Sequence, residues 1–129
     1  MANPNTILLI GIDPFLINFT TPEFADFPGL TAAKVEAGMK DAMKQLIELD
    51  YEVQLCWTDF GQTALSVLEQ VFRSKSFDVV LIGAGIRKPE SNFILFEKMI
   101  NTILTFAPQS KICFNTNPMD SVTAVQRWL

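Results

Sequence analysis

Two unbroken apolar runs stand out in a chain whose other hydrophobic positions are mostly periodic. Thr6–Ile12 and Phe77–Ile82 each contain four consecutive large apolar side chains, Ile-Leu-Leu-Ile and Val-Val-Leu-Ile. Continuous runs of this length are typical of strands covered on both faces, as in a parallel sheet. Tyr51–Thr58 instead alternates apolar and polar residues, and Lys111–Asn115 is short and mixed. We therefore expect two central strands and two edge strands.

The segments between these strands carry the spacing of amphipathic helices. Thr31 is placed to cap the first helix, and Asp59 with Gln62 has the spacing of a capping box at the start of the second. Asn117, followed by Pro118, is placed to cap the last. The expected helices cover residues 31–49, 59–73, 88–107 and a short stretch from 117 onward.

The alternation of strands and helices predicts an α/β fold, a three-layer αβα sandwich around a four-stranded parallel sheet. Placing the apolar strands at the centre and the mixed strands at the edges gives the order 2-1-3-4, as in flavodoxin-like and Rossmann-like folds. The sequence shows no linker, repeat or break in composition. We therefore expect residues 1–129 to form a single domain.

The charge balance bears on the class of partner. The chain has 14 acidic and 10 basic residues, a net charge of −4, which argues against a nucleic-acid-binding or anionic-membrane surface. Hydrophobic residues make up 49% of the chain, which fits a compact folded protein. The first apolar run lacks a preceding basic segment and ends at Asp13 and Pro14, so we expect neither a signal peptide nor a membrane span, and a cytoplasmic location.

The absence of one residue type limits the reactions and metal sites that the chain can support. There is no histidine, the commonest general base and metal ligand. Cys56 and Cys113 fall inside predicted strands without a CxxC spacing, so we expect buried small hydrophobes in a reducing compartment. Asp13 and Asp59, expected at adjacent strand ends, form the kind of carboxylate pair that can hold Mg²⁺. The predicted site nevertheless includes no metal, and the sequence identifies no cofactor.

The strand order also predicts where a site lies. In open α/β sheets, ligands bind beyond the carboxyl ends of the strands at the point where the strand order reverses, here between the first and third strands. A cluster of polar groups at that edge is the default hypothesis for a binding site. The candidate ligand-binding residues are Asp13, Thr58, Asp59, Gly83, Gly85, Arg87, Asn115 and Asn117, with Thr116 beside them.

Each candidate also has a structural explanation. Asp59 and Asn117 are explained as helix caps, and Asp13 before a proline as a turn former. Arg87 either pairs with Asp13 or Asp59 or holds an anion. The segment 83–88 carries the first two glycines of a dinucleotide-binding loop, but it has lysine at the third position and follows the third strand rather than the first.

The segment Phe15–Leu30 has no clear period and carries four phenylalanines and two prolines. Loops of this length in compact domains are usually functional or form interfaces. We interpret it as a flap that covers the strand ends or packs against a second chain; the alternative is that its phenylalanines plug the edge of the core. The third predicted helix has a wide apolar arc, in which Ile94 and Leu95 are candidate homodimer contacts.

Three segments resemble the middle of a response-regulator receiver domain: 49–53 (LDYEV), 59–65 (DFGQTAL) and 77–82 (FDVVLI). The resemblance covers roughly half of the chain. Receiver domains carry the phosphorylated aspartate at the end of the third strand and a lysine on a fifth strand. Here Gly83 and Gly85 occupy that end, and no fifth strand is predicted. The resemblance therefore implies the scaffold of that family without its phosphoryl transfer.

Segments 28–34 (PGLTAAK), 81–87 (LIGAGIR) and 112–118 (ICFNTNP) are also similar to those of small uncharacterised bacterial proteins of Rossmann-like or flavodoxin-like fold, a resemblance that implies no activity. The leading hypothesis is a non-catalytic α/β module that binds a partner protein or a small ligand at the carboxyl edge of the sheet. The alternatives are an enzyme acting on a small anionic substrate, with Asp13 as base and Arg87 as anion clamp, and a purely structural homodimer.

Overall fold

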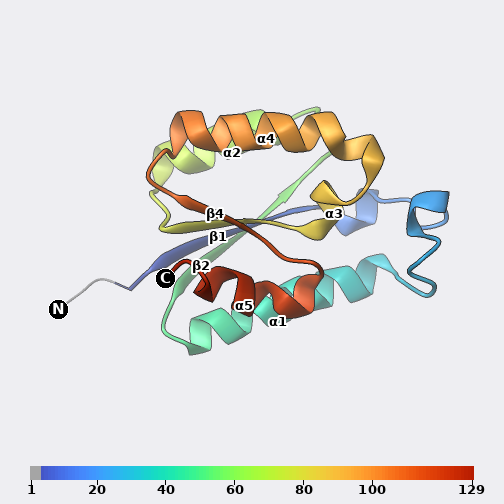
Figure 1. Cartoon of the computed structure of the whole chain (residues 1–129), viewed down its shortest axis with the longest axis horizontal. Coiled ribbons are helices and arrows are strands. Elements are labelled where there is room, and N and C mark those ends of the chain that lie inside the picture. The colour runs from blue at the N-terminus through green and yellow to red at the C-terminus, as the bar shows by residue number, and fades with distance from the viewer. Residues whose placement is uncertain (1–3) are drawn as a thin grey trace.

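The computed structural model describes residues 4–129, so expectations that concern residues 1–3 lie outside the described residues. Its centre is a parallel sheet in the order β2-β1-β3-β4, as predicted. The strands are β1 (Thr6–Ile12), β2 (Glu52–Thr58), β3 (Val79–Ile82) and β4 (Lys111–Phe114). With helices on both faces of this sheet (Figure 1), the topology is that of a flavodoxin-like α/β fold.

The two apolar runs form the two central strands. Every residue of β3 and all of β1 after Thr6 are buried, whereas β2 and β4 are only partly buried. β1 pairs along its whole length with β2 and along four residues with β3, Ile7 lying opposite Val79 and Ile10 opposite Ile82. Alternate residues of β1 therefore enter two separate apolar layers. Leu8, Ile10 and Ile12 face one layer, and Ile7 and Leu9 face the other.

Helices α2 (Ala64–Ser74) and α4 (Phe93–Phe106) cover one face of the sheet, and α1 (Ala32–Glu48) and α5 (Ser121–Gln126) cover the other. A single helical turn, α3 (Ala84–Arg87), follows β3 directly. Four 3₁₀ turns complete the described chain, at Pro14–Leu16, Pro22–Phe24, Glu90–Asn92 and Pro118–Asp120. Figure 1 places the flap at the end of the sheet opposite the two termini.

Three helix starts differ from the prediction, the last because α5 begins at Ser121, after a 3₁₀ turn. α2 begins at Ala64 rather than directly after Asp59, because Gly61 adopts a φ of 117°, a left-handed conformation that a helix cannot contain. Asp59 is therefore not the helix cap itself. The third predicted helix, residues 88–107, begins later, as α4 at Phe93, because Pro89 is extended, at φ −64° and ψ 125°; the preceding turn α3 was not predicted as a helix. Thr31 does cap α1, where its side chain accepts a hydrogen bond from the Lys34 amide.

Cys56 and Cys113 are both free and buried, as predicted, in the apolar layers on opposite faces of the sheet. Burial raises the pKa of both thiols, that of Cys113 to about 12. Leu95, in contrast, does not serve as a dimer contact, because it is only 7% exposed and packs in the core with α2. Among residues 4–129, no helix is long and apolar enough to cross a membrane.

Candidate functional site

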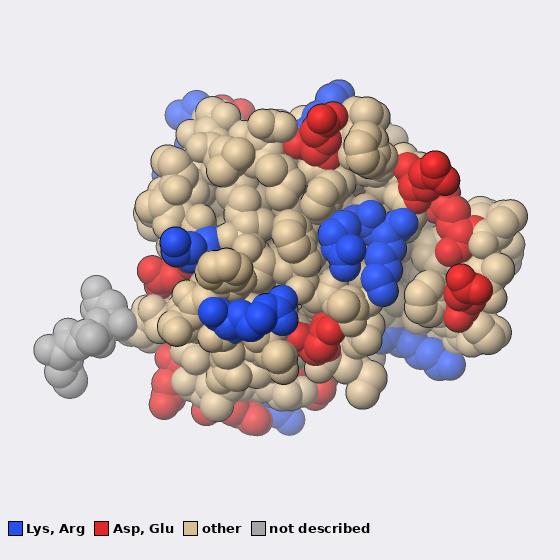
Figure 2. Space-filling model, viewed as in Figure 1, with Lys and Arg blue, Asp and Glu red and all other residues tan. Residues whose placement is uncertain are grey.

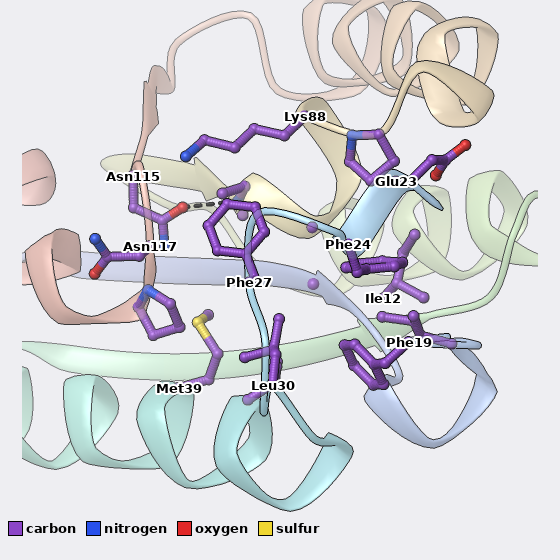
Figure 3. A pocket seen from close by; sticks show the side chains of 18 of the residues that line it. Ile12, Phe19, Glu23, Phe24, Phe27, Leu30, Met39, Lys88, Asn115 and Asn117 are labelled. Atoms are coloured by element: carbon purple, nitrogen blue, oxygen red, sulfur yellow. Dashed lines mark hydrogen bonds between the residues drawn. The ribbon is translucent and has the colours of Figure 1, made fainter. Parts of the chain in front are cut away.

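A cavity of about 410 Å³ lies beyond the carboxyl ends of β1, β3 and β4, beneath the flap. In Figure 3, Phe19, Phe24 and Phe27 of the flap and Ile12, Leu30 and Met39 surround one space. The main chain of Gly11 and of residues 83–85 forms the opposite wall. The cavity therefore lies at the predicted edge of the sheet, and its walls are mostly apolar. The remaining lining residues are Ile17, Glu23, Asp26, Val35, Trp57, Lys88, Pro89 and residues 115–118.

The flap is built from short turns rather than from one regular element. Asp13 begins it, and its carboxylate accepts a hydrogen bond from the Phe15 amide. The rings of Phe19 and Phe24 pack against each other with centroids 5.0 Å apart. The Ser91 hydroxyl donates to the Glu23 carboxylate over 3.0 Å, which ties the flap to the turn before α4. No phenylalanine of the flap belongs to either core layer among the described residues, so these rings do not plug the core: Phe19, Phe24 and Phe27 line the cavity, and Phe15 is exposed.

Two backbone amides of the turn after β3 donate hydrogen bonds to neighbouring segments. The Gly83 amide donates to the Ile10 carbonyl over 2.8 Å, and the Ala84 amide donates to Asn115 Oδ1 over 2.8 Å, the dashed line in Figure 3. Asn115 is 1% exposed, and its Nδ2 donates to the Ser121 hydroxyl. A dinucleotide-binding loop needs free amides for phosphate oxygens. Because these two amides already have partners, the turn is poorly suited to that ligand.

Glycine is required at two positions of the cavity wall for steric reasons. A Cβ on Gly83 would lie 3.1 Å from the Ile10 carbonyl oxygen. A Cβ on Gly11 would lie 2.8 Å from Cζ3 of Trp57, the residue opposite it on β2. The Trp57 indole can approach the end of β1 this closely because Gly11 has no side chain. Gly85 differs, because a Cβ there would meet nothing within 4 Å and would extend into open space.

Arg87 and Lys88 both bind carbonyl oxygens at the end of β4. Arg87 Nη2 donates to the Asn115 carbonyl over 2.9 Å, with the guanidinium 5.8 Å from the Phe114 ring centroid. Lys88 Nζ donates to the Thr116 carbonyl over 2.6 Å and lies 5.8 Å from the Phe27 ring centroid. Only Lys88 lines the cavity. In Figure 3 its side chain extends along the rim toward Asn115.

The structure brings four of the eight predicted site residues to the cavity and leaves four outside it. Gly83, Gly85, Asn115 and Asn117 line it. Asp13, Thr58, Asp59 and Arg87 are absent from its walls. The Thr58 hydroxyl is buried and donates to the Gly11 carbonyl, and Arg87 is directed at β4 rather than at either aspartate.

Asp59 organises the loop before α2. Its carboxylate accepts hydrogen bonds from the amides of Gly61, Thr63 and Ala64 and from the Thr63 hydroxyl. These bonds, that of the Thr63 hydroxyl first, hold the pKa of Asp59 at about 2. Asp59 thus satisfies the first amides of α2 from outside the helix, and this explains the residue without a ligand.

Asn117 is a cap as predicted, but it caps the 3₁₀ turn Pro118–Asp120 that leads into α5 rather than α5 itself. Asn117 Oδ1 accepts from the Met119 amide, and the Asp120 carboxylate accepts from the amides of Thr116 and Asn117. Burial raises the pKa of Asp120, but the hydrogen bonds from Thr116 and Asn117 and the charge of Arg127 together outweigh it and leave that pKa below its ordinary value. This capping box fixes the end of β4 and with it the wall of the cavity that residues 115–118 form.

The described residues offer little for metal binding. Within residues 4–129, no group of three or more His, Cys, Asp or Glu side chains is placed to hold a metal ion. The carboxylates of Asp13 and Asp59 each accept backbone amides of their own loops. Neither lines the cavity, so the proposed Mg²⁺ pair does not form part of this site.

Sequence reasoning missed the residues that give the cavity its character. The hydrophobic pattern predicts only that Trp57 and Met39 lie on the apolar faces of a strand and a helix, and it places Lys88 at the start of a predicted helix. The flap phenylalanines were recognised as a group but not assigned to a site. Their clustering between two strands, next to a strand end, was the one available signal.

Comparison with models of known protein families finds no match for this chain, and comparison with curated proteins finds none either. The function must therefore be inferred from the cavity. Its walls combine aromatic and aliphatic side chains with few polar groups, which is typical of sites that enclose a small ligand.

Proposed function

We propose that this protein is a non-catalytic binding module that encloses a small, mostly apolar molecule between the flap and the carboxyl edge of its sheet. The observation that carries the proposal is the cavity itself, because the side chains of Phe19, Phe24 and Phe27 face the strand ends across a space of about 410 Å³. This volume lies within the range of about 300–1,000 Å³ that is usual for small-molecule sites.

The chemistry of the walls favours binding over catalysis. A nucleophile or general base has to reach the bound molecule. Asp13 and Arg87, the base and anion clamp of the enzymatic alternative, do not line the cavity. The titratable side chains that do are Glu23, Asp26 and Lys88, and two of these already hold the flap or β4 through hydrogen bonds.

The test uses N-phenyl-1-naphthylamine, a neutral apolar dye whose fluorescence rises on leaving water. We expect saturable binding with one dye per chain. Gly85→Leu fills the cavity without backbone strain, because Gly85 lacks a positive φ and a Cβ there meets no atom within 4 Å. This variant should lose binding while Gly85→Ala keeps it. Circular dichroism and thermal melting verify that both variants are folded.

Equal dye binding by wild type and Gly85→Leu, or no saturable binding by either, would contradict the proposal. The Trp57 indole offers a second readout, because it lies in the cavity wall and Trp128 is exposed at the end of the chain. A Trp128→Phe protein reports from Trp57 alone. Its emission should change on dye binding, and energy transfer to the dye should be strong.

Homodimerisation is a second candidate function, supported by apolar side chains at the start of α4. Phe93 is 64% exposed and Ile94 is 54% exposed, although the next residue, Leu95, is buried. Exposed neighbouring apolar side chains of this size favour an interface. Light scattering at low micromolar concentration should then give a dimer mass that Ile94→Glu converts to a monomer. A monomeric wild-type protein would contradict this candidate.

We also propose a cytoplasmic location, supported by two free cysteines that lie in apolar layers on opposite faces of the sheet and so cannot pair with each other. Fractionation of the source cells with an antibody against the protein tests the location. Recovery in a secreted or membrane fraction would contradict it.

A further inference from the structure

We propose that the molecule held in this cavity is an amphiphilic monoanion, an unbranched alkyl carboxylate, whose carboxylate binds Lys88 and whose tail runs past Phe24 into a second hollow. The proposal rests on the proposed binding function and adds the chemical class of the ligand. It depends on two observations that are independent of each other. One is that a second hollow adjoins the first, and the other is that the Lys88 ammonium has no carboxylate partner among the described residues.

The second hollow lies directly against the first. It has a volume of about 300 Å³ and is lined by Leu16, Asn18, Thr21, Phe60, Ser91 and Asn92 in addition to residues of the first cavity. Ile17, Glu23, Phe24, Gly85 and Pro89 line both. The hollows are therefore two compartments along one path, divided by the side chains of the flap. A straight chain fits such a path better than a compact ring system does.

Phe24 is the side chain best placed to divide the compartments. It lines both, and its ring packs on Phe19 rather than in a core layer. Exposed and half-buried aromatic side chains change rotamer rapidly. A rotation of Phe24 about its side-chain bonds would join the two hollows without any change in the sheet.

Lys88 supplies a cation at the far end of this path. Among residues 4–129, the ion pairs are Lys40 with Glu36, Arg73 with Glu69, and Lys75 with Glu52, so Lys88 has no carboxylate partner within 4.0 Å. Its ammonium has three donors, of which one is used by the Thr116 carbonyl. The remaining donors are available to a carboxylate at the cavity rim.

The other charged groups around the cavity are consistent with one anion at Lys88. Arg87 lies next to it and adds positive potential while its own guanidinium is held by β4. Glu23 and Asp26 lie on the flap, and Figure 3 shows the Glu23 carboxylate directed away from the apolar side chains. Figure 2 shows Lys and Arg atoms together on one side of a hollow and Asp and Glu atoms on the other side. Glu23 lines both hollows, so its carboxylate lies beside the path of the tail.

The experiment measures direct binding of linear carboxylates from hexanoate to dodecanoate by titration calorimetry, below their micelle concentrations. Each methylene that becomes buried should tighten binding about fourfold. The neutral analogue 1-decanol should bind at least about tenfold more weakly than decanoate, because it lacks the charge-assisted hydrogen bonds to Lys88. Lys88→Met should remove that difference by weakening decanoate alone.

Two flap variants test the path of the tail and the charge at the cavity rim. Leu16 and Phe60 line the second hollow only, and both are exposed at the surface, so substitutions there should leave the fold intact. Leu16→Ser should weaken dodecanoate several-fold and leave hexanoate unchanged. Asp26→Asn should tighten decanoate and leave 1-decanol unchanged, because it removes a like charge from the cavity rim.

The outcomes separate this inference from the proposed function. Saturable dye binding together with equal affinities for decanoate and 1-decanol, unaffected by Lys88→Met, would overturn the anionic ligand while the binding function stands. The extended path would be overturned if affinity stopped rising with chain length while the tail is still short enough to fit in the first hollow, and if Leu16→Ser did not change the affinity for dodecanoate. Absence of dye, decanoate and 1-decanol binding would overturn both proposals.

Discussion

Two glycines that line the same cavity are expected to respond oppositely to the same substitution. Gly11 lies at the end of β1, where a Cβ would be 2.8 Å from Cζ3 and 3.2 Å from Cε3 of Trp57. Carbon atoms in proteins are in comfortable contact at about 3.5–4.0 Å. The indole therefore has to move in Gly11→Ala. At Gly85 a Cβ meets nothing within 4 Å, so Gly85→Ala needs no adjustment.

The magnitudes follow from this difference in space. Forcing an extra methyl group into packed surroundings costs about 1–3 kcal/mol. A well-tolerated Gly→Ala change stabilises a fold by about 0.4–1 kcal/mol, because it reduces the freedom of the unfolded chain. The unfolding entropy is about 2.1 cal/mol/K per residue, so for 129 residues each kcal/mol shifts Tm by about 4 °C. Gly11→Ala should therefore lower Tm by about 4–11 °C, and Gly85→Ala should raise it by about 1–4 °C.

Thermal unfolding followed by circular dichroism measures both changes, and a double variant identifies the cause. Trp57→Phe removes the indole atoms that the new methyl group meets, so the cost of Gly11→Ala should be much smaller in the Trp57→Phe background. Equal costs of Gly11→Ala in the two backgrounds, or a lower Tm for Gly85→Ala, would refute the packing that we describe.

Two further predictions concern polar groups near the cavity. The pKa of Asp59 is about 2 in the folded protein against an ordinary value of about 3.9, so Asp59 stabilises the fold above about pH 4, and this contribution is lost as the pH falls toward 2. Acid titration of the unfolding free energy should show a smaller loss over that interval in Asp59→Asn; an unchanged profile would contradict the assigned hydrogen bonds. Asn115→Ala leaves the partly buried Ala84 amide without its acceptor and should cost about 1–3 kcal/mol in urea unfolding, more than the exposed cap variant Asn117→Ala. A smaller cost for Asn115→Ala than for Asn117→Ala would show that the Asn115 network does not hold the turn.

Much of the fold could be predicted because hydrophobic pattern and burial are directly related. The continuous runs in β1 and β3 specify strands that are covered on both faces, and the alternation in β2 specifies an edge strand. The start of α2 was less predictable. The Asp59 side chain accepts the Ala64 amide at the start of α2 from a loop that includes Gly61 at positive φ. The same residue pattern is found where an aspartate caps a helix directly, so the sequence does not distinguish the two cases.

The sequence predicts where the site lies but not which side chains form it. The strand order identifies the edge of the sheet, and Gly83 and Asn115 lie there as expected. Which cation faces the cavity depends on the rotation of α3, since consecutive helical residues point in different directions. That rotation directs Arg87 at β4 and Lys88 along the rim. The flap phenylalanines line the cavity together with Met39 and Trp57, which are distant in the sequence. A local sequence pattern does not predict such long-range packing.

The measurement that tests the central claim most directly is an intermolecular NOE experiment on the isotope-labelled protein with N-phenyl-1-naphthylamine bound. The account predicts contacts from the dye to the methyl groups of Ile12, Leu30 and Met39 and to the ring protons of Phe24, all of which line the cavity. Contacts confined to Phe93 and Ile94 on the outer face of α4, or no contacts to the cavity methyl groups at saturating dye, would contradict it.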